Sequence, residues 1–109
     1  MEETPVFACD LSAMTPQQRA RHSELARHWH GGVQALEELP GGYALVFEPT
    51  AERTLELAEW TTLERLCCPF LHLTVELADS GGPLRLRLTG EAGVKPFLAQ
   101  ELGLEKKSG

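Results

Sequence analysis

The chain has 109 residues, with ten lysine and arginine side chains against sixteen aspartates and glutamates, and a formal net charge of -6. This length suits one compact domain and is short for two. The basic residues are scattered, which argues against DNA or RNA as a partner. No apolar run approaches the ~20 residues of a membrane span, and the N-terminus lacks the basic and apolar parts of a secretion signal. We therefore expect a cytoplasmic protein with neither a nucleic-acid nor a membrane partner.

Two elements are predicted in the first third of the chain. Residues Val6–Leu11 are short and mostly apolar, and they predict a strand that carries Cys9. A helix over Pro16–His30 follows, with Thr15 as N-cap and Gln18 at the position that completes a capping box. Two glycines come directly after this helix and favour its end there.

A hairpin and a central helix are predicted next. The segments Val33–Leu39 and Tyr43–Phe47 flank the turn signal Pro40–Gly42, which is typical of two antiparallel strands. The central helix takes Thr50 as N-cap and runs to about Cys68. The proline that follows Cys68 ends it, because a residue before proline is pushed out of the helical region.

A second hairpin and a short helix complete the domain. Apolar and polar residues alternate over Phe70–Leu77 and again over Leu84–Thr89, and a helix is predicted from about Glu91 to Leu102. The sequence thus predicts one α+β domain over residues 1–103, in the order (β)αββαββα. We expect an antiparallel sheet of four or five strands with helices on one face, and a flexible tail at 104–109.

The outward face of this sheet is predicted to be polar. It would carry His72, Thr74, Glu76, Arg85 and Arg87. Such a face is either exposed to solvent or pairs with a second subunit, in which case the protein is a homodimer.

Cysteine provides the most informative chemistry of the sequence. The chain has three cysteines, Cys9, Cys67 and Cys68, an odd number that includes two neighbours, so a secreted disulfide framework is not expected. We predict that all three are reduced. Thiols in a cytosolic protein are buried apolar groups, metal ligands or redox groups.

The cysteine pair has chemically suitable neighbours. Glu64 lies one helical turn before Cys68, and His72 follows four residues after it. Cys9 approaches the pair if the N-terminal strand joins the sheet beside the helix end. We expect Cys67, Cys68, Cys9 and His72 as candidate metal ligands, with Glu64 as the group that exchanges a proton with sulfur.

Electrostatics favour a metal over a reactive nucleophile at this position. A helix C-terminus carries partial negative charge, which opposes thiolate formation, and Glu64 adds to that opposition. A soft cation supplies the missing positive charge and deprotonates the thiols that bind it. Adjacent cysteines do not suit structural zinc, whose ligand pairs are usually spaced by two to four residues. They better suit a two- or three-coordinate ion such as Hg(II), As(III) or Cu(I), or its organic derivative.

A family resemblance points the same way. The stretch Leu63–Phe70 reads L-E-R-L-C-C-P-F, and Phe7–Leu11, Gly82–Leu84 and Thr89–Leu98 accompany it. The chain resembles a family of small bacterial proteins with an E-R-x-C-C-P-F core, whose members often occur near mercury or other heavy-metal resistance genes. The resemblance implies a soft-metal or thiol role for Cys67, Cys68 and Cys9, with a metal ion or a small thiol-reactive molecule as partner.

Two other functions stay open at this stage, so the sequence does not decide whether the protein is an enzyme. One is a thiol-dependent reductase or peroxidase in which one cysteine attacks and another resolves, with Glu64 and His72 moving protons. The other is a structural or dimeric interaction module whose cysteines serve packing.

Overall fold

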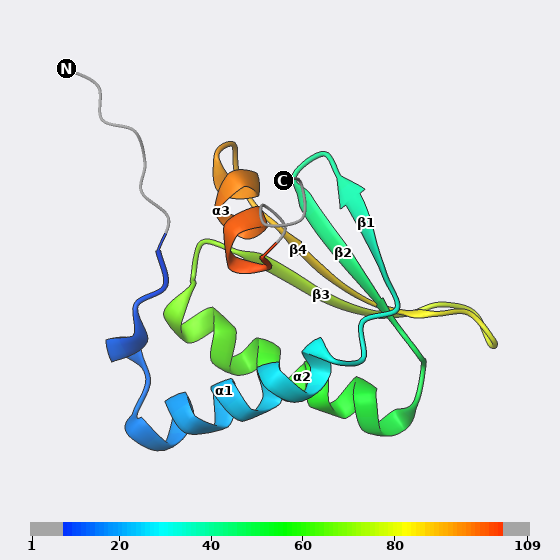
Figure 1. Ribbon diagram of the computed structural model, residues 1–109, viewed down its shortest axis with the longest axis horizontal. Helices are drawn as coiled ribbons and strands as arrows, with labels where there is room; N and C mark the ends of the chain where they lie inside the picture. Colours follow the sequence, from blue (N-terminus) through cyan, green and yellow to red (C-terminus); the bar gives the residue numbers. More distant parts are fainter. Residues whose placement is uncertain (1–7, 104–109) are drawn as a thin grey trace.

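The computed structural model of the protein describes residues 8–103, which form three helices and one sheet (Figure 1). The helices are α1 (Pro16–His30), α2 (Ala51–Cys67) and α3 (Val94–Glu101), and a short 3-10 helix, η1 (Leu11–Ala13), precedes them. The strands are β1 (Ala35–Leu39), β2 (Gly42–Phe47), β3 (His72–Leu77) and β4 (Leu84–Thr89). All pairings are antiparallel, in the order β1-β2-β4-β3. The predicted α+β fold is confirmed, with four strands.

The strand predicted over Val6–Leu11 is wrong for the part that the structure describes. Ala8 to Asp10 have no regular structure, and Leu11 begins η1. The reason is local, because the Asp10 side chain accepts the backbone N–H of Ser12 (3.1 Å) and starts a helical turn. Val6, Phe7 and the tail predicted at 104–109 lie outside the described residues.

The helices begin and end close to the residues that the sequence predicts. At the start of α1, the Gln18 N–H donates to Thr15 Oγ1 (3.1 Å) and the Thr15 N–H donates to Gln18 Oε1 (2.9 Å), which completes the capping box. α2 ends at Cys67, two residues before the proline. α3 begins later than predicted because Gly93 has a φ of 97°, outside the helical region.

One hydrophobic core lies between the sheet and the helices. Leu84, Leu86 and Leu88 of β4 are at most 2% exposed and share this core with residues of α1 and α2. The two helices form a layer beside the sheet (Figure 1). The same core includes buried residues of all three helices: Leu25, Trp29, Leu57, Trp60, Val94 and Leu98. The helices therefore cover one face of the sheet, as predicted. Among the described residues, no helix is both long and apolar enough to cross a bilayer.

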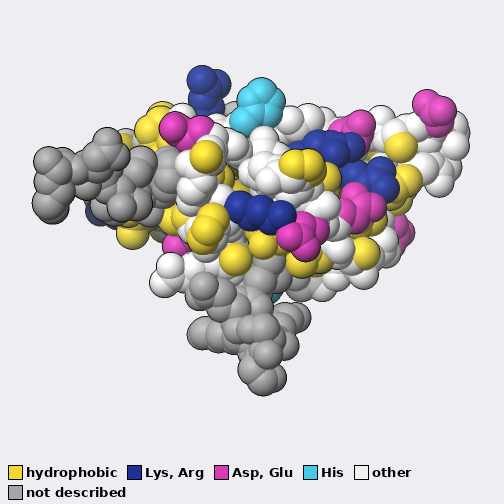
Figure 2. Space-filling model, turned by 90° about the horizontal axis from the view of Figure 1, so that it is seen from above, with side chains coloured by type: hydrophobic (Ala, Val, Ile, Leu, Met, Phe, Trp, Pro, Cys, Tyr) yellow, Lys and Arg dark blue, Asp and Glu magenta, His cyan; other side chains and the backbone are white. Residues whose placement is uncertain are grey.

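The opposite face of the sheet carries ion pairs. Arg85 binds Glu37 through two hydrogen bonds (2.8 and 3.0 Å), and Arg87 binds Glu76 (2.7 Å). Figure 2 looks onto the molecule from above and shows basic and acidic side chains side by side. The alternation of β4 thus places leucines in the core and arginines among carboxylates.

Candidate functional site

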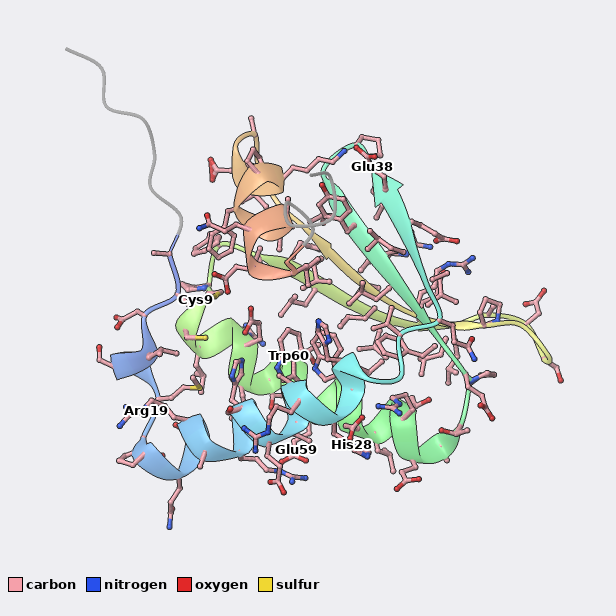
Figure 3. The ribbon with its side chains drawn as sticks, viewed as in Figure 1. Cys9, Arg19, His28, Glu38, Glu59 and Trp60 are labelled. Atoms are coloured by element: carbon pink, nitrogen blue, oxygen red, sulfur yellow. A yellow bond between two sulfur atoms is a disulfide. The ribbon has the colours of Figure 1, made fainter. Side chains whose placement is uncertain are left out.

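Three sulfur atoms meet where α2 ends. Cys67 is the last residue of α2, Cys68 caps the helix, and Cys9 comes from the segment before η1. Cys9 and Cys68 form a disulfide with a Cα–Cα distance of 4.8 Å, and Figure 3 labels Cys9 beside the end of α2. Cys67 is a free thiol, and its Sγ lies 3.9 Å from Cys68 Sγ. All three sulfurs are within 4.8 Å of one another.

The prediction that all three cysteines are reduced is wrong for two of them. The segment before η1 is held against α2 because the Asp10 N–H donates to the carbonyl of Cys67 (2.8 Å). Met14, only 2% exposed, packs in a small apolar cluster with Cys67 and Cys68. These contacts hold Cys9 next to Cys68. The predicted approach of Cys9 does occur, through an irregular segment instead of a strand.

A buried carboxylate adjoins the free thiol. Glu64 is 7% exposed and lies on the same face of α2 as Cys67. The His22 Nε2 of α1 donates to Glu64 Oε1 (2.7 Å), and Cys67 Sγ lies 3.7 Å from the same oxygen. The His22 ring also stacks on Trp60, with centroids 5.5 Å apart. His22, Glu64 and Cys67 therefore form a second group of three ligand atoms within 4.8 Å.

The free thiol is strongly protonated in this environment. Burial and, after it, the negative charge of Glu64 together raise the pKa of Cys67 to about 11. Cys67 is also fully buried, so a guest reaches its sulfur only by displacing side chains that cover it. An unassisted nucleophile is disfavoured here, because the thiolate is the reactive form.

A cavity of about 540 Å³ adjoins this group. Cys9, Cys67, Glu64 and His22 lie on its wall, with Trp29, Trp60, Phe97 and Leu98 among the apolar lining residues. It reaches the surface, since Leu11, which also lines it, is 54% exposed. We call it the sulfur cavity.

Glu101 adds a second acidic group to the lining of the sulfur cavity. Partial burial raises the pKa of Glu101, and the charge of Glu64 raises it further. The two carboxylates therefore disfavour an additional negative charge in this space. They favour a neutral or cationic guest.

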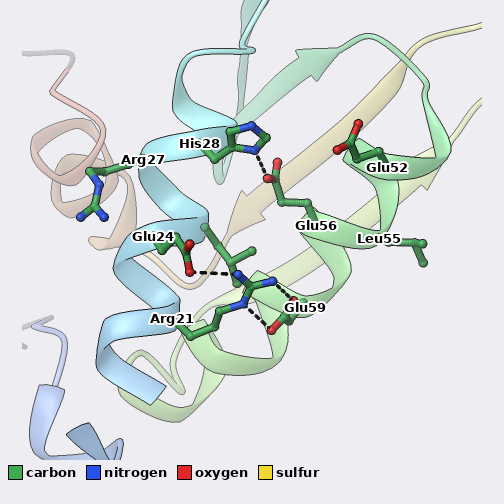
Figure 4. Close-up of a pocket in the computed structure, with 9 residues that line it drawn as sticks. Arg21, Glu24, Arg27, His28, Glu52, Leu55, Glu56 and Glu59 are labelled. Carbon is green, nitrogen blue, oxygen red and sulfur yellow. Dashed lines mark hydrogen bonds and ion pairs between the residues drawn. The ribbon is translucent and has the colours of Figure 1, made fainter. Parts of the chain in front are cut away.

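A different hollow lies between α1 and α2. It has a volume of about 660 Å³ and is lined mainly by charged side chains (Figure 4). Arg21 binds Glu24 (3.0 Å) and Glu59 (2.8 Å), and His28 binds Glu56. We call it the charged hollow.

The structure brings together four of the five predicted site residues. Cys9, Cys67, Cys68 and Glu64 are neighbours, whereas His72 is exposed on β3. Within residues 8–103, His72 belongs to neither group of candidate ligand atoms.

His22 is the functional residue that sequence reasoning did not select. It shares the apolar side of α1 with Leu25, Ala26 and Trp29, which lie three, four and seven residues later. A histidine on the stripe that packs against another helix was the available signal. Nothing in the sequence indicated that this stripe would face Glu64.

No family model, no curated protein and no solved structure matches this chain.

Proposed function

We propose that the protein, once its disulfide is reduced, binds a thiophilic metal ion through Cys9, Cys67 and Cys68. The observation that carries this proposal is that the three Sγ atoms lie within 4.8 Å of one another, with Glu64 beside them. Three sulfurs in this arrangement suit a two- or three-coordinate soft ion such as Hg(II), As(III) or Cu(I). The E-R-x-C-C-P-F core supports the same idea, with heavy-metal resistance as the setting.

A metal resolves the electrostatic conflict at the site. Burial and Glu64 both disfavour a thiolate at Cys67, whereas a bound cation stabilises it. Metal binding releases the thiol proton. The Glu64 carboxylate, held by His22, lies 3.7 Å from the Cys67 sulfur and is placed to receive that proton.

Reduction is a requirement of this proposal. Cys9 and Cys68 share a bond in the structure, so only Cys67 offers a thiol. A dithiol reductant adds two electrons and two protons to that bond, frees both sulfurs and is itself oxidised to a disulfide. We therefore assign metal binding to a reducing compartment, which fits the cytoplasmic location expected from the sequence.

Titration of the fully reduced protein with Hg(II) tests the proposal. Mercury–thiolate absorbance and competition with glutathione give stoichiometry and affinity. We expect one tightly bound ion in the wild type and a loss of at least about a hundredfold in affinity, or about 2.7 kcal/mol, for a Cys67→Ser/Cys68→Ser variant, since this variant lacks two of the three sulfurs.

His72→Ala is the matched control, because His72 is exposed on β3. It should bind Hg(II) like the wild type. Equal affinity in the wild type and the double-serine variant would eliminate metal binding and favour a packing role for the cysteines.

A thiol-dependent peroxidase or reductase is the second candidate, and the Cys9–Cys68 disulfide favours it. In such a reaction two thiols become a disulfide while a peroxide is reduced to an alcohol and water. The high pKa of Cys67 ranks this function second. Peroxide consumption by the reduced wild type, lost in Cys9→Ser and Cys68→Ser, would reverse the ranking.

A further inference from the structure

The sulfur cavity has a property that binding of a bare metal ion does not use. Its wall includes three aromatic side chains, Trp29, Trp60 and Phe97, together with aliphatic residues of the core. A metal ion needs only the sulfurs, and most of the cavity of about 540 Å³ lies beyond them. Apolar walls of this kind are typical of sites that bury an organic group.

Two buried hydrogen-bond donors belong to Trp29 and Trp60, which line the same cavity. Trp29 and Trp60 are 3% and 5% exposed, and neither indole N–H has a hydrogen-bond partner among the described residues. Buried polar groups without a partner are uncommon and call for an explanation. The two indole rings pack edge-on against each other, with centroids 5.1 Å apart, and the π face of a ring accepts an N–H. A guest in the cavity therefore meets aromatic surface, which favours an aromatic group.

We propose that the sulfur cavity binds an arylmercury cation, with the ring against the aromatic wall of Trp29, Trp60 and Phe97. The mercury binds Cys67 Sγ once the side chains that cover this fully buried sulfur move aside. This rests on the proposed function in one respect, since it needs the sulfurs to accept a soft metal. It adds the substrate class and the place of the organic group.

A single free thiol can form one bond to a metal, so it suits a ligand whose metal has one open coordination position. With Cys9 and Cys68 bonded to each other, Cys67 is the one thiol among the three cysteines of the chain. Arylmercury is two-coordinate and linear, so its carbon occupies one position and a single thiolate completes the other. Inorganic Hg(II) needs two sulfurs and therefore the reduced protein.

The binding step is a ligand exchange without oxidation or reduction. The bond between mercury and its departing anion breaks, the mercury–sulfur bond forms, and the carbon–mercury bond stays intact. The thiol proton passes to the Glu64 carboxylate, whose Oε1 lies 3.7 Å from Cys67 Sγ. The anion leaves to solvent.

The charge of the cavity refines the substrate class. Glu64 and Glu101 both line it, and each disfavours a second negative charge nearby. The aryl group should therefore carry no anionic substituent. Phenylmercury is preferred and para-mercuribenzoate is disfavoured.

The test uses the disulfide form of the full chain and compares phenylmercury with methylmercury. Each affinity is measured in competition with glutathione, which cancels the intrinsic strength of the mercury–sulfur bond. We expect a phenyl-to-methyl preference of about tenfold or more, because several additional carbon atoms leave water. Para-mercuribenzoate should bind more weakly than phenylmercury.

Ala26→Phe tests the place of the ring, because Ala26 lines the cavity. This substitution should bring the phenyl-to-methyl ratio close to one. Ala20→Phe is the matched control on the exposed side of α1, and it should keep the wild-type ratio.

The outcomes separate this inference from the proposed function. A wild-type ratio near one, or an unchanged ratio in a folded Ala26→Phe variant, overturns the aryl site even if the reduced protein binds Hg(II). Failure of the reduced protein to bind Hg(II), with the phenyl preference intact, overturns the three-sulfur site alone. If Ala26→Phe does not fold, the methyl, ethyl and phenyl series on the wild type decides: affinity must rise with the size of the group.

Discussion

The two hollows of this protein differ in a way that matters more than their size. The charged hollow is the larger, about 660 against 540 Å³. Its charges lie near the surface, and Arg21 forms ion pairs there with Glu24 and Glu59. The sulfur cavity is lined by residues that carry a fully buried thiol, a nearly buried carboxylate and two buried indole N–H groups, which have no hydrogen-bond partner within residues 8–103. Charges exposed to solvent are screened and hold a ligand weakly, so the smaller cavity, with its buried thiol and carboxylate, is the better candidate site.

The largest expected difference between the two regions concerns packing. Trp60→Ala removes a 5% exposed side chain beside the sulfur cavity and should lower the free energy of unfolding by about 3–5 kcal/mol. Leu55→Ala, in the charged hollow, removes a side chain that is 71% exposed and should change it by less than about 0.5 kcal/mol. Urea unfolding of both variants under oxidising conditions measures this. Similar losses in the two variants would show that the charged hollow is more tightly packed than its exposure indicates.

Reduction of the disulfide should have the next largest effect. The bond joins residues 59 positions apart, and a cross-link over such a loop typically stabilises a protein by about 2–4 kcal/mol. Adding dithiothreitol should therefore lower the urea midpoint of the wild type. A Cys9→Ser variant should be destabilised already and should not respond to the reductant. A response in that variant would indicate that another bond is being reduced.

The carboxylates of the two regions should differ as well. Glu64→Ala leaves His22 without its 2.7 Å acceptor inside the protein and should cost about 1–3 kcal/mol. Glu59→Ala breaks an exposed pair with Arg21 and should cost at most about 1 kcal/mol. Only the second loss should shrink in high salt. Unfolding curves at low and high ionic strength check both statements.

The smallest expected effect is a difference of sign in the response to pH. Arg21 lowers the pKa of Glu59 below its usual 4.5, so the stability contributed by Glu59 is present above that value and is lost as the pH falls. Burial raises the pKa of Glu101, so its contribution is present below 4.5 and is lost as the pH rises through the folded-state value.

Two glutamine variants measure this difference. Glu101→Gln should be more stable than the wild type at neutral pH, and the gain should disappear in acid. Glu59→Gln should show the opposite pattern, with a loss at neutral pH that disappears in acid. Unfolding free energies between about pH 3 and 7 give both profiles, and parallel profiles would contradict the assignment of the two pKa shifts.

The sequence was most informative where structure depends on near neighbours. The capping box at Thr15 and the alternation of Leu84, Leu86 and Leu88 depend on residues a few positions apart, and both are confirmed. The Cys9–Cys68 bond joins positions 59 apart, and the hydrogen bond between His22 and Glu64 spans 42. Contacts between residues so far apart in the sequence depend on how α1 and the N-terminal segment pack on α2. Local sequence patterns do not encode this packing.

The path of the covalent ring has a practical consequence. The bond from Cys9 to Cys68 encloses α1, β1, β2 and α2, and leaves β3, β4 and α3 outside it. One proteolytic cut in the turn at Pro40 and Gly41 would therefore give two fragments that migrate together on a gel until a reductant separates them. The nicked chain would thus report its own oxidation state.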